Sequence, residues 1–345
     1  MSTPMRDQVN PANSGNSSGP SLSNLRAYVS GRTNVLTFLV LAALLAGLTK
    51  GASLSIDSLT NLALAESVRA LASLGVGIII ITRGIDLSVG AVVCLVGSVA
   101  GSFAQNADYG AALYPGVEFG WWAPIAAGLL TGVAFGLVNG LLVAAARIPP
   151  FIATLGTMSV AYGCQLIYTR ANVVGSLKDS YKEIAQGAVL GVPNLALFAL
   201  AAAAVVWYML GHTRQGANIY AIGGNPTAAR VSGINVKKEI VLVYTFAGFL
   251  YGMAGLLLAS RLGLANALTG RGMELDAIAA VTIGGVSQSG GIGTVGGMLI
   301  GVLTLGIINY GMTFLGIDSY FQLVIKGLII IVAVYFDMKK YARGE

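Results

Sequence analysis

The segment IGGNPTAARVSGINV, Ile222 to Val236, is a polar interruption in a chain that is strongly apolar on both sides of it. Asn225 is a favourable N-cap, and Pro226 suits the first helical position that follows. Gly233 suits the left-handed residue beyond a helix end. The two turns between them are too short to be stable alone in water. The pattern therefore predicts a short capped helix that rests on another surface.

The composition places this segment in a membrane protein. The chain has 345 residues, of which 55% are hydrophobic and 10% charged, whereas soluble domains carry roughly a quarter charged residues. Its 47 glycines suit helices that pack closely in lipid. The net charge of +6 comes from basic residues scattered singly between apolar runs, which orients a chain in a bilayer and does not indicate a nucleic-acid partner. Cys94 and Cys164 lie within apolar runs and are interpreted as packing residues.

The apolar runs predict an all-α integral membrane protein with about ten transmembrane helices, since a span needs roughly 20 residues. The expected spans are 35–50, 60–82, 88–104, 121–146, 151–169, 195–210, 240–260, 273–286, 295–313 and 321–336. The eighth is short, and is interpreted as tilted or broken. Residues 1–33 are rich in Ser, Asn, Gly and Pro, which predicts a disordered cytoplasmic tail before a single transmembrane domain, 34–345.

The basic residues predict that both termini are cytoplasmic, because Lys and Arg accumulate on that side of a membrane. This orientation puts twelve of them inside and six outside. The inside set is Arg6, Arg26, Arg32, Arg83, Arg147, Arg214, Arg230, Lys237, Lys238, Lys339, Lys340 and Arg343; the outside set is Lys50, Arg170, Lys178, Lys182, Arg261 and Arg271. The largest inside loop is then 211–239, which contains the opening segment.

The motifs of enzymes are missing from the sequence. It has no G-x-x-x-x-G-K phosphate loop, and His212 has no cysteine or carboxylate cluster near it. Gly291, Gly293 and Gly296 match G-x-G-x-x-G, but they join two apolar spans and not a strand to a helix. They are interpreted as a glycine turn followed by a small-residue helix face. No cofactor, metal or catalytic residue is predicted.

The charged residues inside the spans are interpreted as structural, although such residues are functional candidates by default. Glu66 and Arg69 lie three apart and can pair on one helix face. Glu274 and Asp276 open the eighth span, at the positive end of its dipole. Asp86 can cap the third span. No carboxylate is placed as an ion-coupling group would be.

Four stretches resemble the permeases of ribose-type ABC sugar importers. They are RGIDLSVG (83–90), PPFIATLGTM (149–158), GGNPTAARVSGINV (223–236) and AIAAVTIGGVSQSGGIGTVGG (277–297). The C-terminal run LGIINYGMTFLGIDSYFQLVIKGLIIIVAVYFDMKKYARG looks most similar to the galactoside/methyl-galactoside permeases of that group. The resemblance implies a non-catalytic, multi-pass subunit of the bacterial cytoplasmic (inner) membrane. Its implied partners are an ATP-binding subunit, an extracytoplasmic sugar-binding protein and a second permease copy.

The resemblance makes 211–239 the coupling loop to the ATPase, and three sets of site residues are expected. The coupling residues are Gly223, Gly224, Asn225, Pro226, Thr227, Ala228, Ala229, Arg230 and Gly233. The translocation-path candidates are Thr154, Thr157, Tyr162, Asn309 and Tyr310, for which interhelical hydrogen bonding is an equal alternative. The candidates for docking of the binding protein are Arg170, Lys178, Lys182, Arg261 and Arg271.

Two other functions stay open. A permease for branched-chain amino acids would share the fold but would need charge-complementary groups for a zwitterion. An ion-coupled secondary transporter would need an ion ligand that the spans do not offer. Among sugars, galactose or methyl-galactoside is favoured, and ribose, xylose and inositol remain alternatives.

Overall fold

The structure is a computed structural model that describes the backbone of residues 22–342 and the side chains of residues 34–335, 338 and 339. Its first half contains α1 (Leu22–Leu48), a 3-10 turn (Ala52–Leu54), α2 (Ile56–Ile81), α3 (Val89–Phe103), α4 (Trp122–Ala144), α5 (Pro150–Thr169) and α6 (Asp179–Gln186). Then follow β1 (Ala188–Val189), β2 (Val192–Pro193), α7 (Asn194–His212), α8 (Arg214–Gly224), α9 (Pro226–Val231), α10 (Val236–Leu262), α11 (Met273–Ile283), α12 (Val295–Phe314) and α13 (Ser319–Ala342). The two strands form a small antiparallel hairpin in which Ala188 pairs with Pro193.

The predicted all-α class is confirmed, and each predicted span coincides with a helix. Within the described residues six helices are long and apolar enough to cross a membrane: α2, α4, α5, α7, α10 and α12. Three further apolar helical stretches are shorter, 34–48, 89–103 and 319–335. α11, the short eighth span, has only 11 residues. The chain is thus a multi-pass membrane protein, while ten crossings and the orientation of the termini stay predictions.

The boundary of the expected tail is wrong over residues 22–33, because these residues form the first part of α1. The remainder of that tail, residues 1–21, lies outside the described residues. Ser, Asn and Gly weaken a helix locally, but the apolar run that begins at Val35 continues this helix to Leu48.

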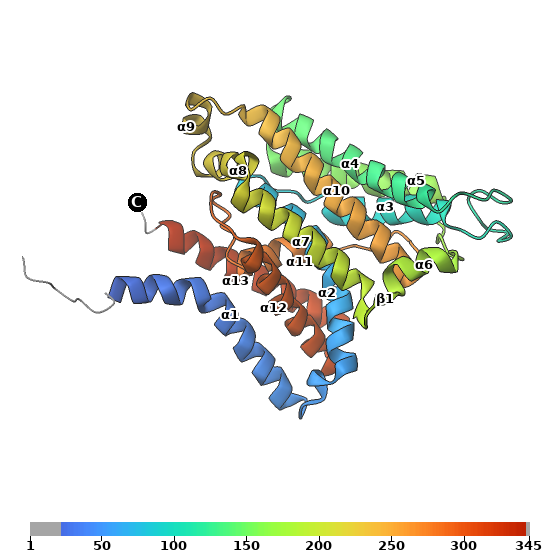
Figure 1. The fold of residues 1–345 in the computed structure, drawn as a ribbon, viewed down its shortest axis with the longest axis horizontal. Coiled ribbons are helices and arrows are strands. Elements are labelled where there is room, and N and C mark those ends of the chain that lie inside the picture. The colour runs from blue at the N-terminus through green and yellow to red at the C-terminus, as the bar shows by residue number, and fades with distance from the viewer. Residues whose placement is uncertain (1–21, 343–345) are drawn as a thin grey trace, which may run out of the picture.

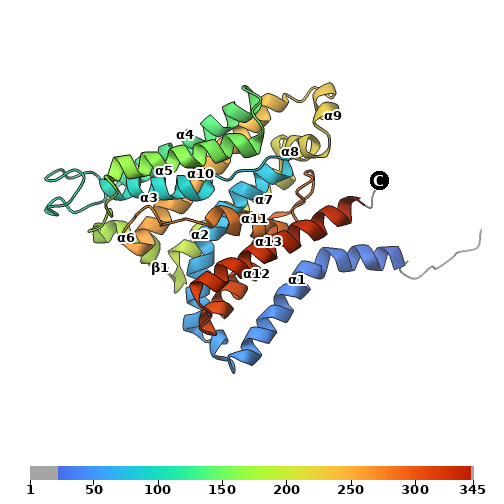
Figure 2. The same cartoon turned by 180° about the vertical axis from the view of Figure 1, so that it is seen from behind.

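The connecting segments gather at two ends of the helix bundle (Figures 1 and 2). At one end, here called the α9 end, lie α8, α9, the turn after α2 and the turn between α11 and α12; Gly291 N donates to Ile81 O over 2.8 Å. At the other, the α6 end, lie α6, the β1–β2 hairpin and the segment after α10, where Val174 and Ala265 form a β-bridge. This segregation agrees with the alternation of inside and outside segments predicted from the spans.

α2–α5 and α10–α13 form an inverted repeat. In each set a long helix (α2 or α10) is followed by a segment without helix, a short helix (α3 or α11) and two longer helices. α2 runs towards the α9 end and α10 away from it, so the two sets have opposite orientation. A shared motif marks the start of each short helix: RGIDLS at 83–88 and RGMELD at 271–276. Inverted repeats with broken helices place transport sites near the membrane centre.

The core of the bundle is formed by α2, α3 and α10, and α4 packs on α10 through glycines. A Cβ atom on Gly136 would lie 2.3 Å from Tyr244 O, and one on Gly132 would lie 2.4 Å from Gly248 O. No side chain fits there, so these glycines set the approach of the two backbones. α12 packs on α11 in the same way, since a Cβ on Gly301 would lie 1.9 Å from Ala280 O. The predicted small-residue face after the glycine turn is confirmed.

Candidate functional site

α9 is the short capped helix that the sequence predicts. The Asn225 side-chain oxygen accepts from the backbone N–H groups of Thr227 and Ala228, each at 3.0 Å. Pro226 occupies the first helical position, and Gly233 adopts the left-handed conformation with φ +88°. Each terminus of this six-residue helix is therefore specified by a residue suited to that position.

One side of α9 is anchored, and the other is presented outward. Ala229 is buried with Ile222 and Val236 in a small apolar cluster. Arg230 is exposed, and Val231 is 85% exposed. The exposed side of α9 therefore carries one cation and one apolar side chain.

The anchor continues through α8 to the end of α2. The Arg83 guanidinium donates from Nε to Gly223 O at 2.6 Å and from Nη2 to Gly224 O at 2.7 Å. These two carbonyls belong to the C-terminal turn of α8, which a helix leaves without partners of its own. Gly223 itself packs on backbone, because a Cβ there would lie 1.8 Å from Ile81 O.

The glycine turn between α11 and α12 joins the same assembly. The Tyr220 hydroxyl of α8 donates to Gly293 O at 2.8 Å, and burial raises the pKa of this hydroxyl above its ordinary value of 10.0. The turn also contacts α2 through the bond from Gly291 N to Ile81 O. Consequently α2, α8 and the 284–294 turn are bonded to one another, and α9 is attached to all three through α8.

The segment between the two long helices is shorter than the expected loop 211–239, and it contains a second helix besides α9. α7 continues to His212, and α10 begins at Val236, so the non-spanning part is residues 213–235. It holds α8, which was not predicted because its glycines disfavour a helix. The contacts of Gly216 and Gly223 with backbone require glycine and outweigh that preference. Arg83 was likewise missed as part of this site, although the RG pair directly after a span is a visible signal.

Thr154 and Thr157, two of the path candidates, are engaged in protein hydrogen bonds. Thr154 Oγ1 donates to Pro150 O at 2.8 Å, and Thr157 Oγ1 lies 2.6 Å from Asn139 Oδ1. The bond to Asn139 continues a chain, since Asn139 Nδ2 donates to Ser88 Oγ at 2.9 Å and Ser88 Oγ donates to Asp86 Oδ1 at 2.6 Å. Thr157 thus makes the interhelical bond of the alternative, whereas Thr154 bonds within α5 and, at 3.3 Å, reaches Ile85 O in the segment before α3.

Asp86 was predicted to cap the third span, but the N-cap of α3 is Ser88, so Asp86 lies two positions before it and bonds to no N–H group of the helix itself. Its Oδ1 also accepts from Ser88 N at 2.8 Å, immediately before α3 begins. Its Oδ2 is buried and has no hydrogen-bond partner among the described residues. Tyr162, the third path candidate, also has a buried hydroxyl without a partner in that part of the chain.

Asn309 and Tyr310, the remaining path candidates, line a cavity of about 230 Å³ between α2, α12 and α13. The Asn309 side chain is buried, and neither its Nδ2 nor its Oδ1 has a partner among the described residues. Tyr310 closes one wall, where its hydroxyl donates to Ser58 Oγ at 2.8 Å. These two residues are thus brought together at a polar cavity, apart from the threonines of α5.

Four charged residues form an ion cluster beside this cavity. The predicted Glu66–Arg69 pair is confirmed. Arg69 Nε also lies 3.6 Å from Asp276 Oδ2, and Lys326 Nζ lies 3.2 Å from Asp276 Oδ1. Asp276 is in the first turn of α11, as predicted, but its two cationic partners were not foreseen. Charges within apolar helices persist when they are paired.

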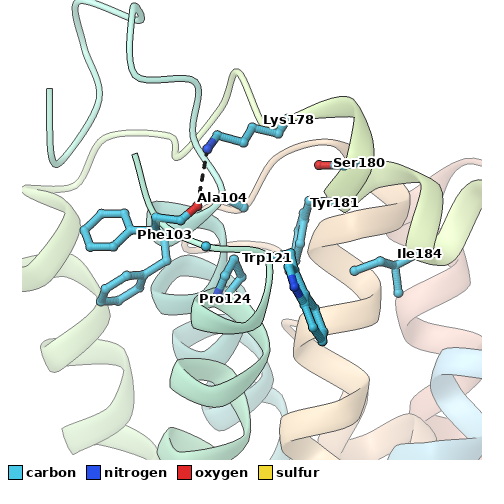
Figure 3. Close-up of a pocket in the computed structure, with 10 residues that line it drawn as sticks. Phe103, Ala104, Trp121, Pro124, Lys178, Ser180, Tyr181 and Ile184 are labelled. Atoms are coloured by element: carbon cyan, nitrogen blue, oxygen red, sulfur yellow. Dashed lines mark hydrogen bonds between the residues drawn. The ribbon is translucent and has the colours of Figure 1, made fainter. Parts of the chain in front are cut away.

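The docking candidates at the α6 end divide into two kinds. Arg170 and Arg271 are exposed, and Lys182 Nζ lies 2.6 Å from Asp179 Oδ1, a contact that lowers the pKa of Asp179. Lys178 lines a cavity of about 220 Å³ together with Phe103, Trp121 and Tyr181 (Figure 3). Its Nζ donates to Phe119 O at 3.5 Å. Trp121 is 79% exposed, as expected of an aromatic residue at a membrane interface.

Arg261, by contrast, turns into the protein. It donates to Leu64 O at 3.3 Å and lines a second cavity, of about 350 Å³, with Arg69, Asp276 and Lys326. This cavity adjoins the one at Asn309, since both are lined by Ala65, Arg69 and Lys326. The position of Arg261 is that of a cavity residue, not of a surface contact.

Comparison with known proteins gives close relatives. The chain is 42% identical over 303 residues to the galactose/methyl galactoside import permease protein MglC of Escherichia coli (strain K12), which covers 85% of this chain and 89% of the relative. It is 39% identical over 319 residues to the ribose import permease protein RbsC of Escherichia coli (strain K12), over 91% of this chain and 96% of the relative. The ribose import permease protein RbsC of Bacillus subtilis (strain 168) is 40% identical over 291 residues, 83% of this chain and 86% of the relative.

No solved structure matches the chain. The family model "Branched-chain amino acid transport system / permease component" matches residues 58–334, a range that runs from α2 into α13 and includes both repeats, α9 and the ion cluster. The resemblance to transport permeases is thereby confirmed, and the chain belongs to the family described as "Branched-chain amino acid transport system / permease component".

Proposed function

We propose that this chain is the membrane permease subunit of a binding-protein-dependent ABC importer for a monosaccharide. Two copies would form one translocation path in a bacterial cytoplasmic membrane, with both termini and α9 on the cytoplasmic side. ATP would be hydrolysed by a separate subunit, and sugar would be delivered at the α6 end by a binding protein. The observation that carries the proposal is α9, a capped helix with an exposed contact surface and a rigid attachment to the bundle.

α9 has the properties required of a coupling helix. Its exposed residues are Thr227, Ala228, Arg230 and Val231. The small side chains of Thr227 and Ala228 would allow a partner to approach the helix closely. Behind it, Arg83 and the apolar cluster around Ala229 transmit displacement to α2. An ATPase that closes on two such helices would move the two permeases as levers. This movement would switch the path from outward-open to inward-open. Because the ATPase would drive it, the path would need no ion ligand.

A sugar substrate is favoured over an amino acid by the relatives and by the charges of the cavities. The galactose/methyl galactoside and ribose permeases are about equally similar to the chain, at 42% and 39% identity, so both sugars are candidates; galactose or methyl galactoside is our first choice. Xylose and inositol follow. The ion cluster pairs two acids with two bases, so it adds no net charge beside the Asn309 cavity.

Docking of the binding protein is proposed at exposed cations of the α6 end, namely Arg170, Arg271 and, more weakly, Lys178 and Lys182. Exposed ion pairs contribute about 1 kcal/mol or less each and weaken with salt. Such contacts suit a partner that must bind and leave in each cycle. Arg261 is not included, because its guanidinium lies against Leu64 and the cavity.

The test is purification of the tagged chain from its native membrane in mild detergent, with Arg230→Glu and Arg214→Glu beside the wild type. Arg214 is an exposed cation at the same end but outside α9, so its reversal is the matched control. We expect an ATP-binding subunit to accompany the wild type and Arg214→Glu, and to be lost from Arg230→Glu. Equal recovery with all three chains would remove α9 from the interface.

Uptake by cells separates the alternative functions. Labelled galactose and ribose are expected to enter in an ATP-dependent manner, with competition by sugars and not by leucine. Competition by leucine would favour the branched-chain amino acid permease. Uptake that needs no ATPase and stops when ion gradients are dissipated would favour a secondary transporter.

A further inference from the structure

We infer that the cavity between α2, α12 and α13 is a sugar-binding subsite of the translocation path, in which Asn309 and Glu66 bind the hydroxyl groups of a neutral sugar. This inference rests on the proposed function, since it names where in the chain the transported molecule is held. The site is distinct from α9 and from the hydrogen-bonded threonines of α5.

The cavity contains buried polar atoms that are left without partners. Asn309 is 8% exposed and Glu66 4% exposed, and both line the cavity. Glu66 Oε2, Asn309 Nδ2 and Asn309 Oδ1 have no hydrogen-bond partner among the described residues. Buried polar groups are almost always paired, and an unpaired one calls for an explanation. The two residues that line this cavity thus carry one unpaired donor group and two unpaired acceptor atoms.

These atoms match the chemistry of a polyol. A sugar hydroxyl both donates and accepts a hydrogen bond, so it pairs with an amide N–H, an amide oxygen and a carboxylate oxygen alike. The volume of about 230 Å³ is suited to a single small ligand and not to a lipid chain. The remaining lining adds polar groups at the mouth: Asn61, Tyr310, Thr313 and Gln322.

The ion cluster keeps the site neutral while it holds Glu66 in place. Glu66 pairs through Oε1 with Arg69, which leaves Oε2 for the ligand. Gly306 permits this placement, because a Cβ atom there would lie 2.5 Å from the Glu66 carboxyl carbon. Asp276 neutralises Lys326 across the cavity wall. A neutral polar site binds an uncharged sugar weakly enough to release it, as transport requires.

The cavity continues past Arg69 towards the segment after α10. The second cavity, of about 350 Å³, is lined by Thr269, Gly270 and Arg271, which lie in the gap before the short helix α11. The two spaces meet at Ala65, Arg69 and Lys326. A path through them would pass the ion cluster at the level of the inverted repeat's broken helix, where transporters of this construction bind their substrates.

The test uses Asn309→Leu, which keeps the side-chain size and removes both polar atoms. Thr304→Val is the matched control, because Thr304 is also buried on α12 but bonds only to its own helix, at Ile300 O, and does not line the cavity. We expect labelled galactose or ribose uptake, whichever the wild type carries, to fall about tenfold in Asn309→Leu, the loss typical of one neutral hydrogen-bonding group. The amount and melting temperature of Asn309→Leu should be unchanged or higher, since an unpaired polar group is removed.

A second measurement detects the sugar in the cavity without any partner subunit. In membranes carrying Asn61→Cys and Cys164→Ser, a thiol reagent labels the cavity mouth, and 100 mM galactose or ribose is expected to slow this labelling while leucine does not. Adding Asn309→Leu should abolish the protection. Cys94 is buried and remains as the internal reference.

Four outcomes decide the inference. Reduced uptake together with lost protection supports it. ATP-driven sugar uptake by the wild type with normal uptake and protection in Asn309→Leu overturns the subsite and leaves the proposed function standing. Failure of the wild type to take up either sugar, with no protection of Asn61→Cys, overturns both. Equal losses in Asn309→Leu and Thr304→Val would assign Asn309 to packing, and would also overturn the subsite.

Discussion

The attachment of α9 to the bundle depends on Arg83, and Arg83→Met is the substitution that tests it most directly. Methionine keeps most of the apolar stem and removes every donor. The carbonyls of Gly223 and Gly224 then lose their bonds of 2.6 and 2.7 Å. The helix α8 remains bonded to the 284–294 turn through Tyr220, so the change loosens one side of the assembly without removing it.

The size of the effect follows from the two bonds. A hydrogen bond to a charged group contributes about 1.5–3 kcal/mol. The bond to Gly224 is exposed to solvent and is counted at about 0.5–1 kcal/mol, which gives about 2–4 kcal/mol for the pair. Because 1.4 kcal/mol corresponds to a factor of ten, local opening of α8 and α9 should become about 30-fold to 1000-fold more frequent.

The assay is hydrogen–deuterium exchange of peptides covering residues 214–231. Exchange in these peptides is expected to accelerate by that factor, while the buried half of α2 and the centre of α10 stay protected. Arg147→Met is the control, since Arg147 is exposed at a helix end and has the same left-handed backbone conformation, φ +59° against +66° for Arg83. ATP-driven uptake should fall in Arg83→Met and not in Arg147→Met.

The reasoning would be refuted by unchanged exchange in α8 and α9 of Arg83→Met. It would also fail if exchange rose equally in α2 and α10, because Arg83 would then support the whole bundle. Arg83→Lys provides a further check: its single ammonium cannot reproduce a two-point contact, so less than half of the lost protection should return.

Three further predictions concern packing, the ion cluster and pH. Gly136→Ala should lower the stability in detergent by about 1–3 kcal/mol, the usual range for overpacking, because its Cβ would meet a backbone oxygen of α10 at 2.3 Å. The control is Gly156→Ala, whose Cβ would have nothing within 4 Å and which should leave the melting temperature unchanged. Asp276→Asn leaves two cations without their shared acid and should cost about 3–5 kcal/mol, and adding Lys326→Met should restore part of the melting temperature. The lysine partner lowers the pKa of Asp179 below its ordinary 3.8. The ion pair is therefore fully formed above pH 3.8 and is lost only as the pH falls through the lowered pKa. Because neither step lies between pH 5 and 8, Asp179→Asn should leave the shape of the melting-temperature profile in that range unchanged.

The positions of the helices could be predicted because each apolar run is long and separated by charged or turn residues. α9 was predictable for a different reason, as Asn225, Pro226 and Gly233 each suit one position of a helix terminus. α8 could not be predicted, because Gly216 and Gly223 act through contacts with backbone from other helices. The start of α1 at Leu22 was missed because a polar composition favours disorder over the whole segment. It does not reveal that a helix formed by the following apolar run extends backwards into that segment.

The candidate site was predicted unevenly. Glu66 and Arg69 are three apart in one helix, so their pairing needs no knowledge of the fold. The partners Asp276 and Lys326 come from two other helices, and no local pattern connects them. Thr157 and Asn309 look alike in the sequence as polar residues within apolar spans. Only the packing of neighbouring helices determines that the Thr157 side chain is hydrogen-bonded, while the Asn309 side chain has no partner in the described part of the chain.

The inverted repeat accounts for the proposed division of roles, in which one end of the molecule contacts the ATPase and the centre holds the substrate. Its two copies of the motif, RGIDLS and RGMELD, place Arg83 opposite Arg271 and Ser88 opposite Asp276 in the alignment. In the first copy the arginine binds the α8 carbonyls, and the serine donates to Asp86 and accepts from Asn139.

In the second copy the arginine is exposed at the α6 end, and the aspartate joins the ion cluster beside the cavities. The same backbone arrangement thus carries a mechanical attachment in one half and a charged, polar lining in the other. Since α2 contains Arg69 and ends directly before Arg83, a displacement of α8 by a partner at α9 acts on the helix that also forms the cavity wall. Coupling over this distance requires no chain of moving side chains, because α2 is one continuous helix from Ile56 to Ile81.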